Sequence, residues 1–320
     1  MNSKKIISLL ICITALFMLM IVCASASFSG DVYYIAEESD DTIIRPQEKS
    51  GTTYLFLPSS ADLTKLVLGS DTNYTKLTVT ADKSVSTDFG MPVDILSLFD
   101  KPDSLDGEYK VTVTALAESG EDYQQEIIIM KSENISSLFI VSEDPENKGR
   151  SWIDTSKSNK AKGSMVFLNA DGTVRHADEM TEIKARGNST FTDFTKKAYQ
   201  FKIKSKAALT GGEDNAQKKW VLLANAGDIT LIHNSLVVAL ANDLNIPYTI
   251  DCEPVDLYYD GEYRGSYIIT DKVEVGDTGV DIQDLDGEIE DINEGTDAYE
   301  DPVVVTKTRL SGGVTDAPVD

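Results

Sequence analysis

The chain has little cysteine, little histidine and too little basic charge to balance its acids. Its 320 residues include three cysteines and two histidines, and 53 Asp and Glu outnumber 29 Lys and Arg, which gives a formal net charge of −24. A protein that binds nucleic acid needs a basic surface to neutralise the phosphates, so this balance excludes nucleic acid as a partner. The hydrophobic fraction of 41% suffices for buried cores, and the length allows about two domains.

The chain has one long apolar run, and this run lies at the N-terminus. Residues 6–22 follow two lysines and precede the small residues 24–26. This pattern is typical of a secretory signal peptide, so we expect residues 1–26 to be removed and the mature protein to have no stable membrane insertion. Two alternatives stay open, namely an uncleaved membrane anchor, because the run approaches spanning length, and a lipoprotein modified at Cys23.

Removal of the signal would leave Cys252 as the single cysteine, which excludes an intrachain disulfide. An exported protein without disulfides suits a bacterial envelope better than a small disulfide-stapled domain. We therefore expect a secreted, cell-surface or spore-envelope location.

The remaining chain divides by composition into three parts. Residues 27–50 are polar and acidic and are interpreted as a spacer with room for one short strand at Val32–Ile35. Residues 51–133 contain short runs rich in β-branched and aromatic residues that are separated by turn signals, which predicts a small immunoglobulin-like β-sandwich. Residues 137–320 form a second unit with further strands, one helix at 229–244 and a hairpin around Asp260-Gly261.

The most informative stretch of the second unit combines a turn with a strand that carries lysines. The turn contains Arg186, Asn188 and Ser189, and Lys197 and Lys202 follow. Turn amides, an arginine and strand lysines are groups that hold polyphosphate, so we predict a nucleotide site here. The alternatives are that the arginine pairs with a surface acid, that the lysines are solvated, and that the turn residues only cap the turn.

The order of elements after this turn is that of a protein-kinase small lobe. A strand with Lys202 precedes the helix, the two-strand hairpin and a hinge at Thr270-Asp271. No Gly-x-Gly-x-x-Gly loop precedes Lys202, so the turn at Arg186 would have to replace it. The predicted fold class is therefore α+β, with a kinase-like small lobe behind a β-sandwich.

Several sequence blocks within residues 137–310 together resemble the CotH family of spore-coat, kinase-like proteins. The blocks are 184–190, 196–203, 219–225, 231–235 and 257–267 with 270–272. The resemblance implies ATP and Mg²⁺ as cofactors and Ser/Thr of exported or coat proteins as substrates. It implies nucleotide binding by six residues, which are Arg186, Asn188, Ser189, Lys197, Lys202 and Asp271. Members of the family commonly have glutamate at the position of Asp271 and arginine at the position of His233.

The family's catalytic and metal-binding aspartates lie well downstream of the hinge. We therefore expect them beyond Asp320, assign no catalytic residue or metal ligand within the chain, and expect an incomplete domain that is inactive alone. Whether the chain is an enzyme stays open. The alternative is a non-catalytic extracellular structural or adhesion protein on the same scaffold.

The acidic, Gly-rich residues 276–301 are interpreted as a loop or a weak helix. A calcium loop centred on Gly287 would need acidic residues where the sequence has Ile282 and Asn293, so a solvated acidic segment is the alternative we favour.

Overall fold

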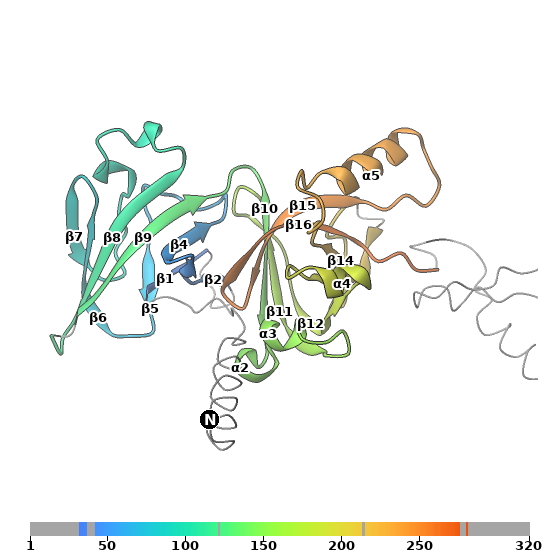
Figure 1. The fold of residues 1–320 in the computed structure, drawn as a ribbon, viewed down its shortest axis with the longest axis horizontal. Helices are drawn as coiled ribbons and strands as arrows, with labels where there is room; N and C mark the ends of the chain where they lie inside the picture. The colour runs from blue at the N-terminus through green and yellow to red at the C-terminus, as the bar shows by residue number, and fades with distance from the viewer. Residues whose placement is uncertain (1–31, 37–41, 121, 213–214, 276–279, 281–320) are drawn as a thin grey trace, which may run out of the picture. The chain divides into compact units, whose positions relative to one another are not determined.

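The computed structural model describes residues 32–36, 42–120, 122–212, 215–275 and 280 (Figure 1). The expected signal peptide lies outside these residues. The chain divides into two compact units. The first takes in the described residues up to Val141 together with Val166–Val174 and Asp256–Arg264, and the second takes in Ser142–Met165, Arg175–Val255 and the described residues from Gly265 on.

The first unit contains two sheets that share one hydrophobic core. The smaller sheet has the order β2-β1-β5, formed by Ile43–Ile44, Val32–Ile35 and Leu68–Ser70. The larger has the order β3-β4-β9-β8-β6-β7, formed by Gln47–Lys49, Thr52–Leu57, Asp122–Lys131, Glu108–Ala117, Tyr74–Thr80 and Ser84–Asp88. Two short 3-10 helices, η2 (Leu96–Leu98) and η3 (Pro102–Ser104), join β7 to β8.

The stretch that we expected to be an acidic spacer contributes strands to both sheets. Val32 of β1 and Ile44 of β2 are buried in the core of the first unit. The short strand expected at Val32–Ile35 is present, whereas β2 and β3 are only two and three residues long, so their alternation was too short to be distinguished from a polar linker.

Seven strands close into a barrel with the order β10-β11-β12-β13-β14-β16-β15. They are Ser136–Ser142, Ala161–Leu168, Val174–Arg186, Ala198–Ala207, Gln217–Leu223, Glu262–Asp271 and Cys252–Tyr259. The helices that connect them are α2 (Pro145–Lys148), α3 (Arg150–Ile153), α4 (Ser189–Asp193) and α5 (His233–Asp243).

This closed barrel shows that the predicted α+β kinase-like small lobe was wrong. The expected order of lysine strand, helix and hairpin is present along the chain. However, β15 pairs with β10, which precedes it by more than a hundred residues, and this pairing closes the ring. Closure satisfies the backbone groups of the strands that would otherwise be sheet edges. Local patterning gives no information on which edges meet, so the order of elements alone suggested an open lobe.

Alternation along the strands separates the barrel interior from its outer face. Tyr199 and Phe201 on β13 and Trp220 and Leu222 on β14 are fully buried. Lys202 lies between buried neighbours and is exposed, as the period of two requires. Arg186 and Lys184 follow the same outer face of β12, because Ala185 between them is buried.

The predicted hairpin is confirmed. Asp260 and Gly261 have φ of +51° and +80°, as a type I′ turn requires, and they join β15 to β16. The predicted helix is present but shorter. It begins at His233, since the stretch from Asp228 to Ile232 forms turns instead. No helix in the part of the chain that the structure describes is long and apolar enough to cross a membrane.

Candidate functional site

The predicted site residues near the turn lie at one end of the barrel. Arg186, the last residue of β12, pairs with Ala198 at the start of β13. Tyr199 of β13 pairs with Leu222 near the end of β14. The segments that follow β12, precede β13 and follow β14 therefore emerge at the same end, which we call the Arg186 end.

Arg186 is half-buried and lacks a compensating acid. No hydrogen bond or ion pair of its guanidinium is found among the described residues. Burial is the cause that lowers its pKa from the ordinary value, and no neighbouring carboxylate counters this effect. The arrangement is unusual, because a buried charge is normally paired. An anion bound at this position would supply the missing partner.

The turn after Arg186 depends on a glycine. Gly187 has φ of +105°, and Asn188 precedes α4 without capping it through its side chain. The Asn188 side-chain oxygen instead accepts a hydrogen bond of 3.1 Å from Nζ of Lys157. Ser189 is exposed in the first turn of α4. Asn188 and Ser189 thus lie beside Arg186 as predicted, and their nucleotide role stays a prediction.

We expect Gly187→Ala to destabilise this turn. A Cβ at Gly187 would lie 2.1 Å from Oγ1 of Thr190, and the positive φ strains any side chain. The cost should be about 1 kcal/mol or more, seen as faster amide exchange in residues 186–197. The matched control is Gly212→Ala, where nothing lies within 4 Å of the added Cβ. Equal exchange in the two variants would contradict this role for Gly187.

The Lys197 side chain is hydrogen-bonded to backbone carbonyl groups. Its Nζ donates to the carbonyl oxygens of Phe191 and Phe194 at 2.5 and 2.6 Å and lies 4.7 Å from the centre of the Phe191 ring. These contacts hold the end of α4 against β13. The nucleotide role predicted for Lys197 therefore competes with a structural one.

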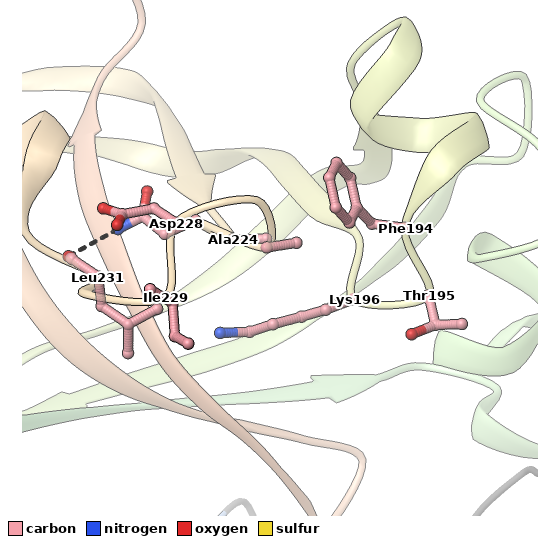
Figure 2. A pocket seen from close by; sticks show the side chains of 9 residues that line it. Phe194, Thr195, Lys196, Ala224, Asp228, Ile229 and Leu231 are labelled. Carbon is pink, nitrogen blue, oxygen red and sulfur yellow. Dashed lines mark hydrogen bonds between the residues drawn. The ribbon is translucent and has the colours of Figure 1, made fainter.

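A pocket of about 340 Å³ also lies at the Arg186 end (Figure 2). Its walls come from the segment before β13 and the segment between β14 and α5, and include Phe194, Ala224 and Ile229, with Asp228 at one side. The Lys196 side chain extends along it and donates to the carbonyl oxygen of Ser266 at 2.5 Å. The volume falls in the range of small-molecule sites.

Sequence reasoning did not select Lys196, although it opens the block 196–203. Its Nζ lies 4.4 Å from the centre of the Tyr267 ring. Lys196 is distinguished from Lys197 by this aromatic partner on β16, which is seventy-one positions away and could not be inferred from spacing.

Lys202 and Asp271 do not lie at the Arg186 end. Lys202 pairs with Glu182 on β12. This pair lies four residues along the strands from the Arg186–Ala198 pair, so the two pairs are roughly 13 Å apart. Asp271, the last residue of β16, pairs with Trp220 in the middle of β14, two residues before Leu222. Four of the six predicted residues therefore lie at the Arg186 end, and Lys202 and Asp271 lie further along the strands.

Asp271 is half-buried and accepts a hydrogen bond of 3.1 Å from the backbone N–H of Asp251. Burial raises the pKa of its carboxyl above the ordinary value, and the nearby Asp251 acts in the same direction. This carboxyl fixes the start of β15 against the end of β16.

The loop between β14 and α5 is organised by Asp228. Its carboxylate accepts hydrogen bonds from the Thr230 hydroxyl at 2.6 Å and from the His233 backbone N–H at 3.0 Å. Asn225, with φ of +48°, accepts a bond of 2.8 Å from the Asn234 side chain. These contacts fix one wall of the pocket.

We expect the Asp228 carboxyl to titrate with a pKa of about 2 rather than its ordinary 3.8, chiefly because the Thr230 hydroxyl donates to the charged form. Since the folded value is depressed, its contribution to stability is present above the ordinary value and is lost as the pH falls through about 2. Carbon-13 NMR of the carboxyls should show this pKa rise towards 3.8 in Thr230→Val. Thr192→Val, whose hydroxyl bonds Ser189 and Asp193, should leave it unchanged.

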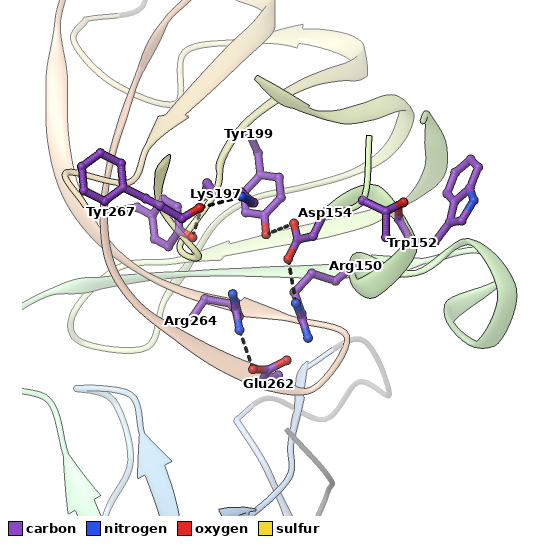
Figure 3. Close-up of polar contacts among 10 residues, drawn as sticks. Arg150, Trp152, Asp154, Lys197, Tyr199, Glu262, Arg264 and Tyr267 are labelled. Atoms are coloured by element: carbon purple, nitrogen blue, oxygen red, sulfur yellow. Dashed lines mark hydrogen bonds and ion pairs between the residues drawn. The ribbon is translucent and has the colours of Figure 1, made fainter. Parts of the chain in front are cut away.

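A polar network supports the β13 side of this unit (Figure 3). Asp154 accepts hydrogen bonds from Nη1 of Arg150 and from the hydroxyl of Tyr199, each at 2.7 Å. The Arg150 and Asp154 side chains are only 11% and 15% exposed, and Tyr199 is fully buried. Sequence reasoning missed this network because its members are separated by up to forty-nine positions.

No group of three or more His, Cys, Asp or Glu side chains that could hold a metal ion is found among the described residues. Mg²⁺ takes near-octahedral oxygen ligands and is commonly held by one or two carboxylates together with substrate phosphates. No metal ligand is assigned among the described residues, and no chemical step is assigned to this ion.

The fold and the site define a mostly β protein whose closed barrel carries an uncompensated arginine beside a small pocket at one end. Comparison with known families agrees with the resemblance in the sequence. Residues 183–302 match the family described as CotH kinase protein, which confirms the resemblance over this C-terminal part of the chain. The match includes the Arg186 end, α5 and the β15–β16 hairpin. No curated protein matches the chain.

Proposed function

We propose that the Arg186 end of the barrel binds the phosphates of a nucleoside triphosphate in a CotH-type protein kinase. The observation that carries the proposal is the half-buried Arg186 guanidinium without an acidic partner, within the part of the chain that matches the CotH kinase family. A phosphate oxygen is the anion that an arginine binds with good geometry and charge.

The pocket beside Lys196 supports binding of the nucleoside part. Phe194, Ala224 and Leu231 offer apolar surface to a base and a sugar. ATP would thus place its base and sugar in this pocket and its phosphates towards Arg186. Lys202, four residues along β13, would serve only the distal end of an extended polyphosphate.

The proposed activity is transfer of a phosphoryl group from ATP to Ser/Thr of exported or coat proteins at the cell or spore surface. Phosphoryl transfer depends mainly on positioning and on compensation of charge. The Arg186 end would contribute to the positioning of the nucleotide and to the compensation of its negative charge. Mg²⁺ would arrive with the nucleotide, since no cluster of ligands for it exists among the described residues.

Titration calorimetry of the full chain with ATP and with adenosine tests this proposal. ATP should bind with a measurable heat and adenosine should bind at least about ten-fold more weakly, because a charge-assisted hydrogen bond contributes roughly 1.5–3 kcal/mol. Inorganic triphosphate should compete with ATP. Equal binding of ATP and adenosine, or no binding of either, would contradict the proposal.

A further inference from the structure

Strand β7 forms one edge of the six-stranded sheet in the first unit (Figure 1). It pairs with β6 in a regular register that runs from Thr80–Ser84 to Lys76–Asp88. No second strand pairs with β7 in the part of the chain that the structure describes. An unpaired edge of this kind offers a row of backbone donors and acceptors to another extended segment.

The backbone groups of Ser84 and Ser86 point away from β6. The Phe89 N–H donates to the Thr75 carbonyl oxygen at 3.0 Å, so these two residues form a hydrogen-bonded pair that continues the β6–β7 register. Hydrogen-bonded and non-hydrogen-bonded pairs alternate along antiparallel strands, so every second residue counted back from Phe89 bonds β6. Ser84 and Ser86 fall between those residues. Their N–H and C=O groups therefore face outward, and among the described residues no backbone group from elsewhere bonds them.

The β7 edge lacks the features that usually keep an exposed strand from pairing. Natural edges are protected by lysine, proline, bulges or inward-pointing charges. The sequence of β7 is Ser-Val-Ser-Thr-Asp, and its register with β6 has no bulge. Its single charged residue, Asp88, lies at the end of the strand and pairs with Lys76 on β6 at 2.5 Å. The edge is therefore open to strand addition, in which an extended peptide joins a sheet.

Hydroxyl groups line the solvent face of the sheet at this edge. The side-chain oxygens of Ser86 and Thr78 are 2.8 Å apart, and those of Ser84 and Thr80 are 2.9 Å apart. Strand β8 continues both rows with a further threonine in each. A strand added at β7 would place alternate side chains beside Ser84 and Ser86. Serine or threonine at those positions would extend the cross-strand hydroxyl pairs.

The core-facing side of β7 favours an apolar residue between these hydroxyl positions. Val85 lies between Ser84 and Ser86 and shares a face of the sheet with its partner Val79, which is 1% exposed. Val85 itself is 36% exposed, and no described strand covers it from beyond the edge. An apolar side chain on an added strand would bury Val85, and burial of apolar surface is favourable.

We propose that the β7 edge binds an extended segment of another protein in which serine or threonine alternates with apolar residues. Backbone hydrogen bonds to Ser84 and Ser86 supply the affinity, and the hydroxyl rows and Val85 select the side-chain pattern. The net charge of −24 disfavours an acidic segment. The same charge opposes the main rival occupant, which is the β7 edge of a second copy of this chain.

Fluorescence anisotropy of the full chain with a labelled peptide tests this proposal. In the peptide, threonine alternates with valine, and a lysine at each end keeps it soluble. It should bind the wild type saturably. A control peptide of the same charge, with proline in place of the central valine, should bind about ten-fold more weakly or less, because proline removes a backbone donor and interrupts the ladder.

Two variants locate the binding at β7. Ser86→Pro removes the outward N–H, and an edge strand tolerates proline where the N–H faces solvent. Ser86→Lys keeps the N–H and adds the side chain that protects natural edges. Each should weaken peptide binding about ten-fold or more. The matched control is Gln124→Lys on β9, which lies in the same cross-strand row three strands from β7 and should leave binding unchanged.

Three results would overturn the proposal. The first is no binding of the threonine–valine peptide, or equal binding of the proline peptide. The second is equal peptide binding by Ser86→Lys and Gln124→Lys. The third is a wild-type dimer in sedimentation experiments that Ser86→Lys converts to a monomer, which would assign the edge to a second copy. Amide exchange in β8 and β9 should be the same in all variants, which checks that the sheet stays folded. ATP affinity should also be unchanged, so the outcome is independent of the nucleotide site.

Discussion

Arg186→Ala should weaken ATP binding by about ten- to hundred-fold. A hydrogen bond between charged groups contributes roughly 1.5–3 kcal/mol, and each 1.4 kcal/mol is a factor of ten in the dissociation constant. The loss should be near the upper limit because the guanidinium is half-buried and has no other anion to contact among the described residues. Calorimetric titration with ATP measures the effect.

Two further variants separate the geometry of Arg186 from its charge. Arg186→Lys keeps the charge but loses the forked donors, so it should restore only part of the affinity. Lys110→Ala removes one charge from an exposed pair with Glu126 on the six-stranded sheet and should have no effect. An equal loss of ATP affinity in Lys110→Ala would show that the effect comes from the net charge of the protein. Unchanged ATP affinity in Arg186→Ala would show that Arg186 does not contact the nucleotide.

Asp154→Ala should lower the free energy of unfolding of the second unit by about 3 kcal/mol. The carboxylate bonds Arg150 and Tyr199 in a largely buried position, and removal of one member of a buried ion pair typically costs about 3–5 kcal/mol. Both tryptophans of the chain, Trp152 and Trp220, lie in this unit. Urea unfolding followed by tryptophan fluorescence therefore reports on it directly.

An exposed ion pair in the same unit provides the matched control. Lys204 and Glu179 form a contact of 2.8 Å, but their side chains are 60% and 70% exposed. Glu179→Ala should cost less than about 1 kcal/mol, because water screens such pairs. Equal shifts of the unfolding midpoint in the two variants would contradict a structural role for the Asp154 network.

Local features of the fold followed from the sequence, whereas its closure did not. The Asp260-Gly261 turn was predictable because few residue pairs adopt positive φ at both positions. The helix was predictable from its apolar spacing, although that spacing normally indicates a buried side and here the side is exposed. The pairing of β15 with β10 depends on strands that are far apart in the sequence, and no local pattern encodes it.

The candidate site was predicted in part for the same reason. Arg186, Asn188 and Ser189 are neighbours in the chain and remain neighbours in the fold. Lys202 and Asp271 were grouped with them by analogy to an open lobe, but strand direction carries both away from the Arg186 end. Partners such as Ser266 and Tyr267 of Lys196 are set by tertiary contacts, which single-sequence spacing does not contain.

The most direct test of the nucleotide site is the footprint of ATP in amide hydrogen exchange of the full chain. Bound ATP should slow exchange in residues 186–197 and 224–231, which surround Arg186 and the pocket, with little change in the six-stranded sheet. Adenosine alone should protect the 224–231 segment less and leave residues 186–190 unchanged. Protection confined to other strands, or none at a saturating ATP concentration, would contradict a nucleotide site at the Arg186 end.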